Sequence, residues 1–259
     1  MNYVLSELKE KVAYLTFNNP QKRNALSAAL LSELFAGLEE LERNKVPVVI
    51  IRAEKGAKIW SSGHDVKELP KSHRDPLSYY NPLEKILRKI QEYPGPVIAL
   101  VQGGVWGGAC DLIMTCDMVI GDSTCSFAIT PVKIGVPYNA SGILHFLNRV
   151  PLNLAKEMFF TAQPFDAERA ERCGILNHLV PSEELEDFVF QFARRLTSNS
   201  ALAVAVIKEQ LRILSDAHPI PPSAFERIQG LRRRVYDSHD YTEGIRAFLE
   251  KRPPVFKGE

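Results

Sequence analysis

The sequence predicts an α/β fold that ends in a helical region, and three observations support this class. Two continuous apolar segments, 47–53 and 96–101, have the composition of strands buried on both faces of a sheet. A glycine-rich turn at 103–108 follows the second segment and precedes an expected helix. Beyond residue 140, apolar residues recur mainly at helical spacing. Strands that alternate with helices, followed by helices alone, are typical of an α/β domain with a C-terminal helical region.

The elements of the first half follow from local composition. Residues 2–8 and 11–17 predict a strand pair, because β-forming residues occur there and the turn sequence Asn-Asn-Pro follows. Ser27 is expected to cap a helix. The apolar face of that helix would consist of Leu30, Leu31, Leu34, Leu38 and Leu41. Residues 54–81 are polar and predict a loop, and 82–92 predict a helix.

The second half contains mostly helices. After the glycine-rich turn we expect a helix over about 108–116 and a strand over 117–121. A short apolar segment at 175–180 interrupts the later helices. Those helices are expected over 152–161, 166–173, 182–198, 200–216, 221–237 and 240–250. We therefore divide the chain into a core, 1–198, and a C-terminal helical region, 199–259.

The charge balance gives no support for nucleic-acid binding. The 259 residues include 32 basic and 31 acidic side chains, so the formal net charge is +1. The basic run Arg232-Arg233-Arg234 is better explained as a solvated or intersubunit face. No apolar segment approaches the ~20 residues of a membrane-spanning helix, and the N-terminal segment has no secretory pattern. We expect a soluble cytoplasmic protein without a membrane or nucleic-acid partner.

Four cysteines, Cys110, Cys116, Cys125 and Cys173, are expected to be reduced thiols. They form no C-x-x-C pair and have no histidine partners at the spacing of a zinc site. The sequence therefore predicts neither a disulfide framework nor a metal site.

Two glycine-bearing turns share one design. Each follows an apolar segment, the first at 61–65 (Ser-Ser-Gly-His-Asp) and the second at 106–111 (Trp-Gly-Gly-Ala-Cys-Asp). Glycine lets backbone N–H groups point into a cleft, and a helix N-terminus favours negative charge. Two such groups directed at one oxygen form an oxyanion hole. Taken singly, each turn is better explained as a strand-to-helix corner, and neither has the spacing of a phosphate-binding loop.

Four stretches together resemble the crotonase (enoyl-CoA hydratase/isomerase) superfamily. Residues 19–27, NPQKRNALS, are similar to its N-P-x-x-x-N-A-L loop. Residues 59–69, IWSSGHDVKEL, are similar to F-x-A-G-x-D-x-x-E-L, and residues 101–111, VQGGVWGGACD, to G-x-x-x-G-G-G-x-E. Residues 248–256, FLEKRPPVF, are similar to the usual end of the family. The resemblance covers essentially the whole chain.

This resemblance implies a spiral of β-β-α turns, with C-terminal helices that mediate homotrimers, often stacked as homohexamers. It also implies an acyl-CoA substrate and a thioester enolate, with no cofactor beyond the coenzyme A of the substrate. The oxyanion donors would be the backbone N–H groups of His64 and Gly108. Lys251 would approach the CoA phosphates from its own or a neighbouring subunit, and Asp65 is expected to cap a turn. The implied binding positions are Asn24, Ala25, Leu26, Ser62, Gly63, Asp65, Val66, Thr130, Val132 and Lys251.

The carboxylates of the family indicate which reaction to expect. Hydration needs two carboxylates to handle the protons of water. By resemblance, one position holds Asp111 and the other holds Val132, which cannot accept a proton. The segments around His64, Thr130 and Tyr138 instead resemble family members that decarboxylate methylmalonyl-CoA to propionyl-CoA. The sequence therefore favours a carboxy-lyase over a hydratase.

Loss of CO₂ from a malonyl thioester needs no general base, and a second carboxylate would repel the departing one. Tyr138 could donate a hydrogen bond to that carboxylate, and Thr130 could line the acyl pocket. Asp111 either faces the pocket or is a structural acid in the first turn of its helix. Two alternatives remain open. One is another acyl-CoA reaction, namely hydration, isomerisation or thioester hydrolysis, and the other is a non-catalytic acyl-CoA-binding protein.

Overall fold

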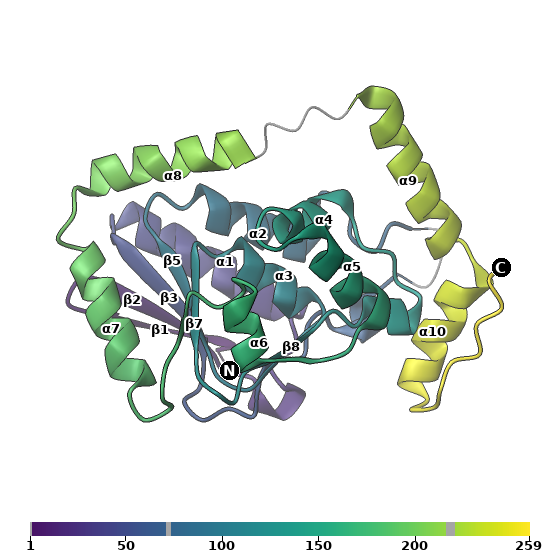
Figure 1. Cartoon of the computed structure of the whole chain (residues 1–259), viewed down its shortest axis with the longest axis horizontal. Coiled ribbons are helices and arrows are strands. Elements are labelled where there is room, and N and C mark those ends of the chain that lie inside the picture. The colour runs from purple at the N-terminus through teal and green to yellow at the C-terminus, as the bar shows by residue number, and fades with distance from the viewer. Residues whose placement is uncertain (1, 71–73, 216–220) are drawn as a thin grey trace.

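A six-stranded sheet is the larger of the two sheets in the computed structural model, which describes residues 2–70, 74–215 and 221–259 (Figure 1). Its strands, in spatial order, are β1 (Val4–Lys9), β2 (Val12–Phe17), β3 (Val48–Ala53), β5 (Val97–Val101), β7 (Met118–Gly121) and β10 (His178–Leu179). β1 runs antiparallel to β2, and the other neighbours are parallel. β3 and β5 are almost fully buried, which confirms the two predicted core strands.

The smaller sheet contains β4 (Ile59–Ser61), β6 (Gly104–Trp106), β8 (Ser126–Ala128) and β9 (Phe165–Asp166). The chain builds both sheets together, since β3, β5 and β7 join the larger sheet and the strand after each joins the smaller one. The segments β3-β4-α2 and β5-β6-α3 are thus successive β-β-α turns. β4 and β6 pair in parallel, so the two glycine turns that follow them lie side by side.

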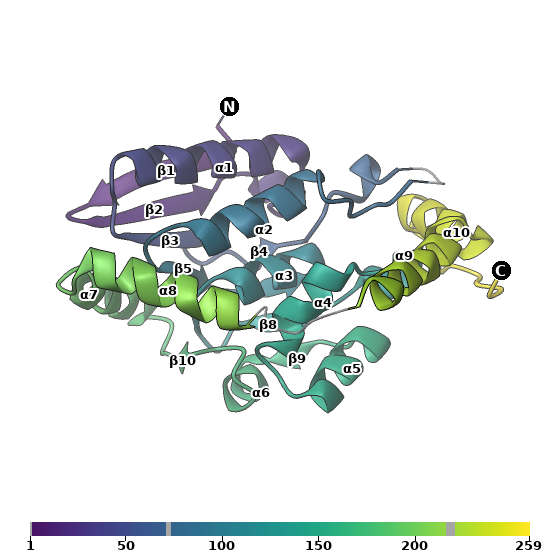
Figure 2. The ribbon, with the colours of Figure 1, turned by 90° about the horizontal axis from the view of Figure 1, so that it is seen from above.

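Helices cover both faces of the larger sheet, with α1 and α2 on one side and α7 on the other (Figure 2). The helices are α1 (Ala28–Arg43), α2 (Pro82–Glu92), α3 (Gly108–Thr115), α4 (Ala140–Leu147), α5 (Leu152–Thr161), α6 (Ala167–Arg172), α7 (Leu185–Leu196), α8 (Ala201–Ser215), α9 (Pro222–Tyr236) and α10 (His239–Leu249). Short 3-10 turns are η1 (Pro20–Lys22), η2 (Val66–Glu68) and η3 (Pro131–Ile134). Ser27 caps α1 by accepting from the N–H of Leu30, and all five predicted leucines are buried.

Most predicted elements are confirmed to within a few residues, but several short ones were missed. The predicted loop at 54–81 contains β4 and η2, and neither β6, β8 nor α4 was predicted. Strands of three residues are too short to show alternation, and α4 is apolar on several sides. Residues 71–73 of that loop, and residue 216 of the predicted helix at 200–216, lie outside the described residues.

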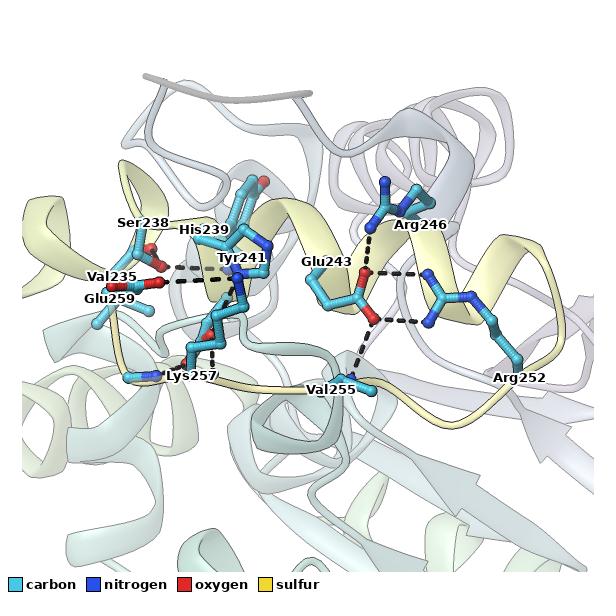
Figure 3. Close-up of polar contacts among 12 residues, drawn as sticks. Val235, Ser238, His239, Tyr241, Glu243, Arg246, Arg252, Val255, Lys257 and Glu259 are labelled. Atoms are coloured by element: carbon cyan, nitrogen blue, oxygen red, sulfur yellow. Dashed lines mark hydrogen bonds and ion pairs between the residues drawn. The ribbon is translucent and has the colours of Figure 1, made fainter.

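α10 packs against α9 and η3, and ionic contacts fix α9 and α10. Arg232 on α9 is only 6% exposed and contacts the Asp75 carboxylate through two nitrogens, at 2.7 and 2.5 Å. Arg232 was predicted to belong to a solvated or intersubunit face, and its burial against Asp75 within one chain corrects the solvated alternative for this residue. On α10, the buried Glu243 carboxylate accepts from Arg246, Arg252 and the N–H of Val255 (Figure 3). These bonds fold the last residues back along α10.

The four cysteines are free thiols, as predicted. Burial raises the pKa of Cys116 to about 12 and also raises the pKa values of Cys110 and Cys125. Cys173 is half-buried and forms the C-cap of α6. Among the described residues, no helix is both long and apolar enough to cross a membrane.

Candidate active site

A cavity of about 550 Å³ lies where the turns after β4 and β6 meet η3 and α10. Nine of the positions predicted from the sequence line it, and they come from five separate stretches of the chain. These positions are Ala25, Ser62, His64, Asp65, Val66, Gly108, Asp111, Thr130 and Tyr138. Phe248, on α10, also lines the cavity.

The backbone N–H groups of His64 and Gly108 approach the same small space. A methyl group added at Gly108 would lie 3.5 Å from the His64 nitrogen, and one added at Gly63 would lie 3.0 Å from the Gly108 nitrogen. Within the described residues, neither N–H donates a hydrogen bond. Gly63 (φ +81°) and Gly107 (φ +55°) turn the backbone so that both groups stay unpaired. Gly108 also begins α3, whose N-terminus favours negative charge at this point.

The loop at 24–26 holds the first of these turns in place from behind. The backbone of Leu26 donates to Gly63 O at 2.8 Å and accepts from the N–H of Asp65, on either side of His64. The buried Asn24 side chain bonds to the backbone of Asn19 and of Trp60. Asn24, Leu26 and Gly63 thus lie behind the cavity wall, whereas Ala25 lines the cavity.

Tyr138 places a buried, unpartnered hydroxyl beside the cavity. Its oxygen has no hydrogen-bond partner among the described residues. Burial, and then the nearby negative charge of Asp111, raise the pKa of Tyr138 far above its usual value. The hydroxyl therefore stays protonated and can donate a hydrogen bond to a ligand.

Asp111 faces the cavity, which decides between the two placements left open by the sequence. Its side chain is almost fully buried, and Oδ1 lies 2.6 Å from Nδ1 of His145 on α4. A methyl group added at Gly142 would lie 2.8 Å from Asp111 Oδ2 and 2.5 Å from the Tyr138 ring. The first turn of α4 therefore packs directly against both side chains.

A second buried carboxylate, Glu84 on α2, lies behind this group and was not predicted. Its oxygens accept from Asn139 Nδ2 at 2.6 Å and Ser141 Oγ at 3.0 Å. Burial raises the pKa of Glu84, the charge of Asp111 raises it further, and the two hydrogen bonds lower it. Glu84 does not line the cavity. Glu84 and its partner Asn139 are 55 residues apart in the sequence. No local sequence pattern could therefore have identified Glu84.

Two predicted binding positions lie away from the cavity. Val132 is 48% exposed, and η3 turns it toward a neighbouring apolar cavity of about 410 Å³. Lys251 is exposed, follows α10 with φ +56°, and is not part of the lining in a single chain. Asp65 caps η2 through a 3.1 Å bond from the N–H of Lys67, as predicted.

Basic side chains that were not predicted from the sequence line part of the cavity. They are Lys22, Arg23, Lys67 and Lys133. Three of them lie within the two motif stretches at 19–27 and 59–69. Their closeness in sequence to these motifs could have indicated that they lie near the site. Such a group of cations suits a ligand that carries phosphates. The described residues contain no group of His, Cys, Asp and Glu side chains that could hold a metal ion.

Sequence comparison supplies relatives over nearly the full chain. The enoyl-CoA hydratase/isomerase family model matches residues 7–259. Methylmalonyl-CoA decarboxylase of Escherichia coli strain K12 is 50% identical over 248 residues, which cover 96% of this chain and 95% of that protein. The human mitochondrial enoyl-CoA hydratase domain-containing protein 3 is 35% identical over 253 residues, which cover 95% of this chain and 80% of that protein.

Two solved structures of methylmalonyl-CoA decarboxylase share the fold. The complex with 2-nitronate-propionyl-CoA has a TM-score of 0.97 and 49% identity, and the match covers 99% of both chains. The complex with 2S-carboxypropyl CoA has a TM-score of 0.98 and 49% identity, and the match covers 100% of this chain and 99% of that one. The predicted spiral of β-β-α turns followed by C-terminal helices is confirmed.

Proposed function

The chain belongs to the enoyl-CoA hydratase/isomerase family, and from this premise we propose that it decarboxylates methylmalonyl-CoA to propionyl-CoA. The observation that carries the proposal is the pairing of two unpartnered N–H groups, at His64 and Gly108, with the unpartnered hydroxyl of Tyr138. The two N–H groups suit a thioester oxygen, and the Tyr138 hydroxyl suits a carboxylate. A methylmalonyl thioester contains both groups.

In the reaction, the bond between C2 and the carboxyl carbon breaks and its electron pair passes to the thioester oxygen. The N–H groups of His64 and Gly108 stabilise that enolate oxygen. Tyr138 and Thr130 orient the carboxylate so that the breaking bond lies perpendicular to the thioester plane. CO₂ leaves, and C2 takes up one proton. No step requires a protein base.

We propose that the coenzyme A portion extends past the wall formed by Ala25, Ser62, Asp65 and Val66. The cations of Lys22, Arg23 and Lys67 at this wall would attract its phosphates. Lys251 would contribute from its own or a neighbouring subunit. The protein would use no cofactor apart from the coenzyme A of its substrate and would act in the cytoplasm, which cell fractionation can test.

We propose that the chain forms homotrimers, or hexamers built from trimers, through the C-terminal region at 199–259. α8, which lies along the outside of the molecule in Figure 1, supports this. Its outer side exposes several large apolar side chains along its length. They are Leu202, Val206, Ile207, Leu211, Ile213 and Leu214. Lys208 anchors the opposite side of the helix to Asp117 at 2.7 Å and to two backbone carbonyls.

The experiment that tests the function is a substrate panel. Purified protein with methylmalonyl-CoA should release propionyl-CoA, followed by mass spectrometry, while crotonyl-CoA should be hydrated much more slowly. No propionyl-CoA at high protein concentration would overturn the proposal. Faster hydration of crotonyl-CoA would favour a hydratase, and binding of CoA thioesters without turnover would favour a non-catalytic binding protein.

A further inference from the structure

A carboxylate on the wall of this cavity conflicts with a carboxylate on the substrate. Asp111 lines the cavity, and its Oδ2 lies next to the Tyr138 ring, where the substrate carboxylate would be held. Two like charges at such short range in a poorly solvated site repel strongly. Some feature of the chain must therefore offset the Asp111 charge if the proposed substrate is to bind.

His145 is placed to do this. It lies on α4 and is not part of the cavity lining, and its side chain is only 11% exposed. Nδ1 lies 2.6 Å from Asp111 Oδ1 and 3.3 Å from Thr115 Oγ1, while Nε2 lies 3.2 Å from Gln91 Nε2. The Gln91 amide can present either its N–H or, when turned over, its oxygen to Nε2, so it accommodates neutral and protonated imidazole alike.

The other groups facing the pair make this neutralisation more necessary. Glu84 on α2 adds a second carboxylate behind Asp111, offset by hydrogen bonds from Asn139 and Ser141 at the start of α4. Thr115 already donates its hydroxyl proton to the backbone of Asp111. His145 Nδ1 lies within hydrogen-bond distance of Asp111 Oδ1 and can supply a proton to it.

We propose that His145 is a positioning residue that makes the Asp111 side chain electrically neutral and so lets the cavity accept a carboxylated acyl-CoA. In this arrangement one proton is shared between Nδ1 and Oδ1, and a second proton on Nε2 faces the Gln91 amide oxygen. The net charge of the pair is then zero whether the shared proton lies on the imidazole or on the carboxyl. The hydrogen bond also holds Oδ1 on the α4 side. The inference rests on the proposed function, because only a carboxylated substrate requires this neutrality.

The test measures binding of two inert thioethers, 2-carboxypropyl-CoA and uncharged propyl-CoA, by titration calorimetry. The proteins are the wild type, His145→Gln, Asp111→Asn and the double variant. His178→Gln, at an exposed position in β10 that contacts Phe188 of α7, is the control. His145→Gln should weaken binding of the carboxylated ligand at least about tenfold, and change binding of propyl-CoA less than about twofold. Adding Asp111→Asn should restore the carboxylated ligand to within about threefold of the wild type.

Equal loss of both ligands in His145→Gln would show a purely structural role and overturn the inference. So would unchanged binding of the carboxylated ligand, or failure of Asp111→Asn to restore it. Turnover is measured separately on wild-type protein with methylmalonyl-CoA. A wild type that binds both thioethers but releases no propionyl-CoA overturns the proposed function and leaves the charge discrimination as an independent result.

Discussion

Gly108 occupies the first position of α3, where a backbone N–H has no partner within the helix. Proline is tolerated at this position of a helix and has no N–H, so Gly108→Pro removes one donor with little disturbance of α3. We expect kcat to fall about 10²–10³-fold, the usual effect of losing one oxyanion donor.

The matched control is Gly108→Ala. It adds the same Cβ, 3.0 Å from a Leu83 methyl group, but keeps the N–H. Steady-state kinetics with methylmalonyl-CoA should show a much smaller loss for alanine than for proline. Equal losses would mean that crowding against Leu83, and not the missing donor, limits the rate.

Tyr138→Phe tests the second donor. The hydroxyl makes no hydrogen bond among the described residues, so its removal leaves no protein group unpaired and folding should be unaffected. A hydrogen bond to a charged group contributes about 1.5–3 kcal/mol, which predicts a fall in kcat of roughly 10- to 100-fold. Binding of propyl-CoA should be unchanged. An unaltered kcat would remove Tyr138 from the mechanism.

At the level of single residues, the sequence predicted the side chains that lie within motifs and missed those that act across the fold. His64, Gly108 and Tyr138 line the cavity, and so does Asp111, whose placement the sequence left open. His145 could not be singled out, because its partner Asp111 is 34 residues away and only the docking of α4 on α3 joins them. For the same reason, the turn of Val132 away from the cavity had no signature in the sequence.

Among the elements, α4 is the one on which the side chains of the site depend most closely. Gly142 lies in its first turn, and a methyl group there would come within 2.5 Å of the Tyr138 ring and 2.8 Å of Asp111. Gly142→Ala should therefore destabilise the fold by about 1–3 kcal/mol through overpacking and should lower kcat by displacing Tyr138.

Gly230 in α9 provides the comparison, since a methyl group there would meet nothing within 4 Å. Gly230→Ala should leave kcat unchanged and stabilise the helix by up to about 1 kcal/mol. Thermal unfolding of both variants checks the pair. If Gly142→Ala unfolds like the wild type and keeps its activity, α4 does not pack closely against Tyr138 and Asp111.

Long elements with one apolar face were predictable, and the elements that shape the cavity were less so. α1 begins directly after its predicted cap Ser27, and α2 has the predicted bounds 82–92, because capping residues and periodic apolar residues mark them. β4 and β6 were missed, yet their parallel pairing brings the two glycine turns together. That pairing links residues about 45 positions apart in the chain, beyond the range of any local pattern.

In the whole molecule, the buried Glu243 holds the end of the chain against α10 through two arginines and the backbone of Val255 (Figure 3). These bonds lower the pKa of Glu243 far below its usual value, with the Arg252 contact first among the causes. A carboxylate with a lowered folded-state pKa stabilises the protein above its unfolded pKa of about 4.3 and loses that contribution as the pH falls further.

The wild type should therefore melt at a higher temperature than Glu243→Gln at pH 7, and the difference should shrink as the pH falls below about 4. Differential scanning calorimetry from pH 7 to pH 3 measures it. A constant difference across that range would mean that packing, and not ionisation, accounts for the role of Glu243.

The assembly proposed for the whole molecule makes a separate prediction. Leu211→Asp places a charge on the exposed apolar side of α8 and should convert trimers or hexamers into smaller species, as measured by light scattering. Arg212→Gln, a neighbour that already pairs with Glu209 within the helix, is the matched control. A wild type of single-subunit mass would refute the assembly, which the sequence predicted only through family resemblance.

The burial of the cysteines has a practical consequence for measuring that assembly. Thiol reagents attack the thiolate, and burial raises the pKa values of Cys110, Cys116 and Cys125 and shields their sulfur atoms. Cys173, at the end of α6, is the more accessible thiol and is not part of the cavity lining. A maleimide dye should therefore label the unmodified chain once per subunit. Mixing donor- and acceptor-labelled subunits would then report subunit exchange by energy transfer while the enzyme is turning over.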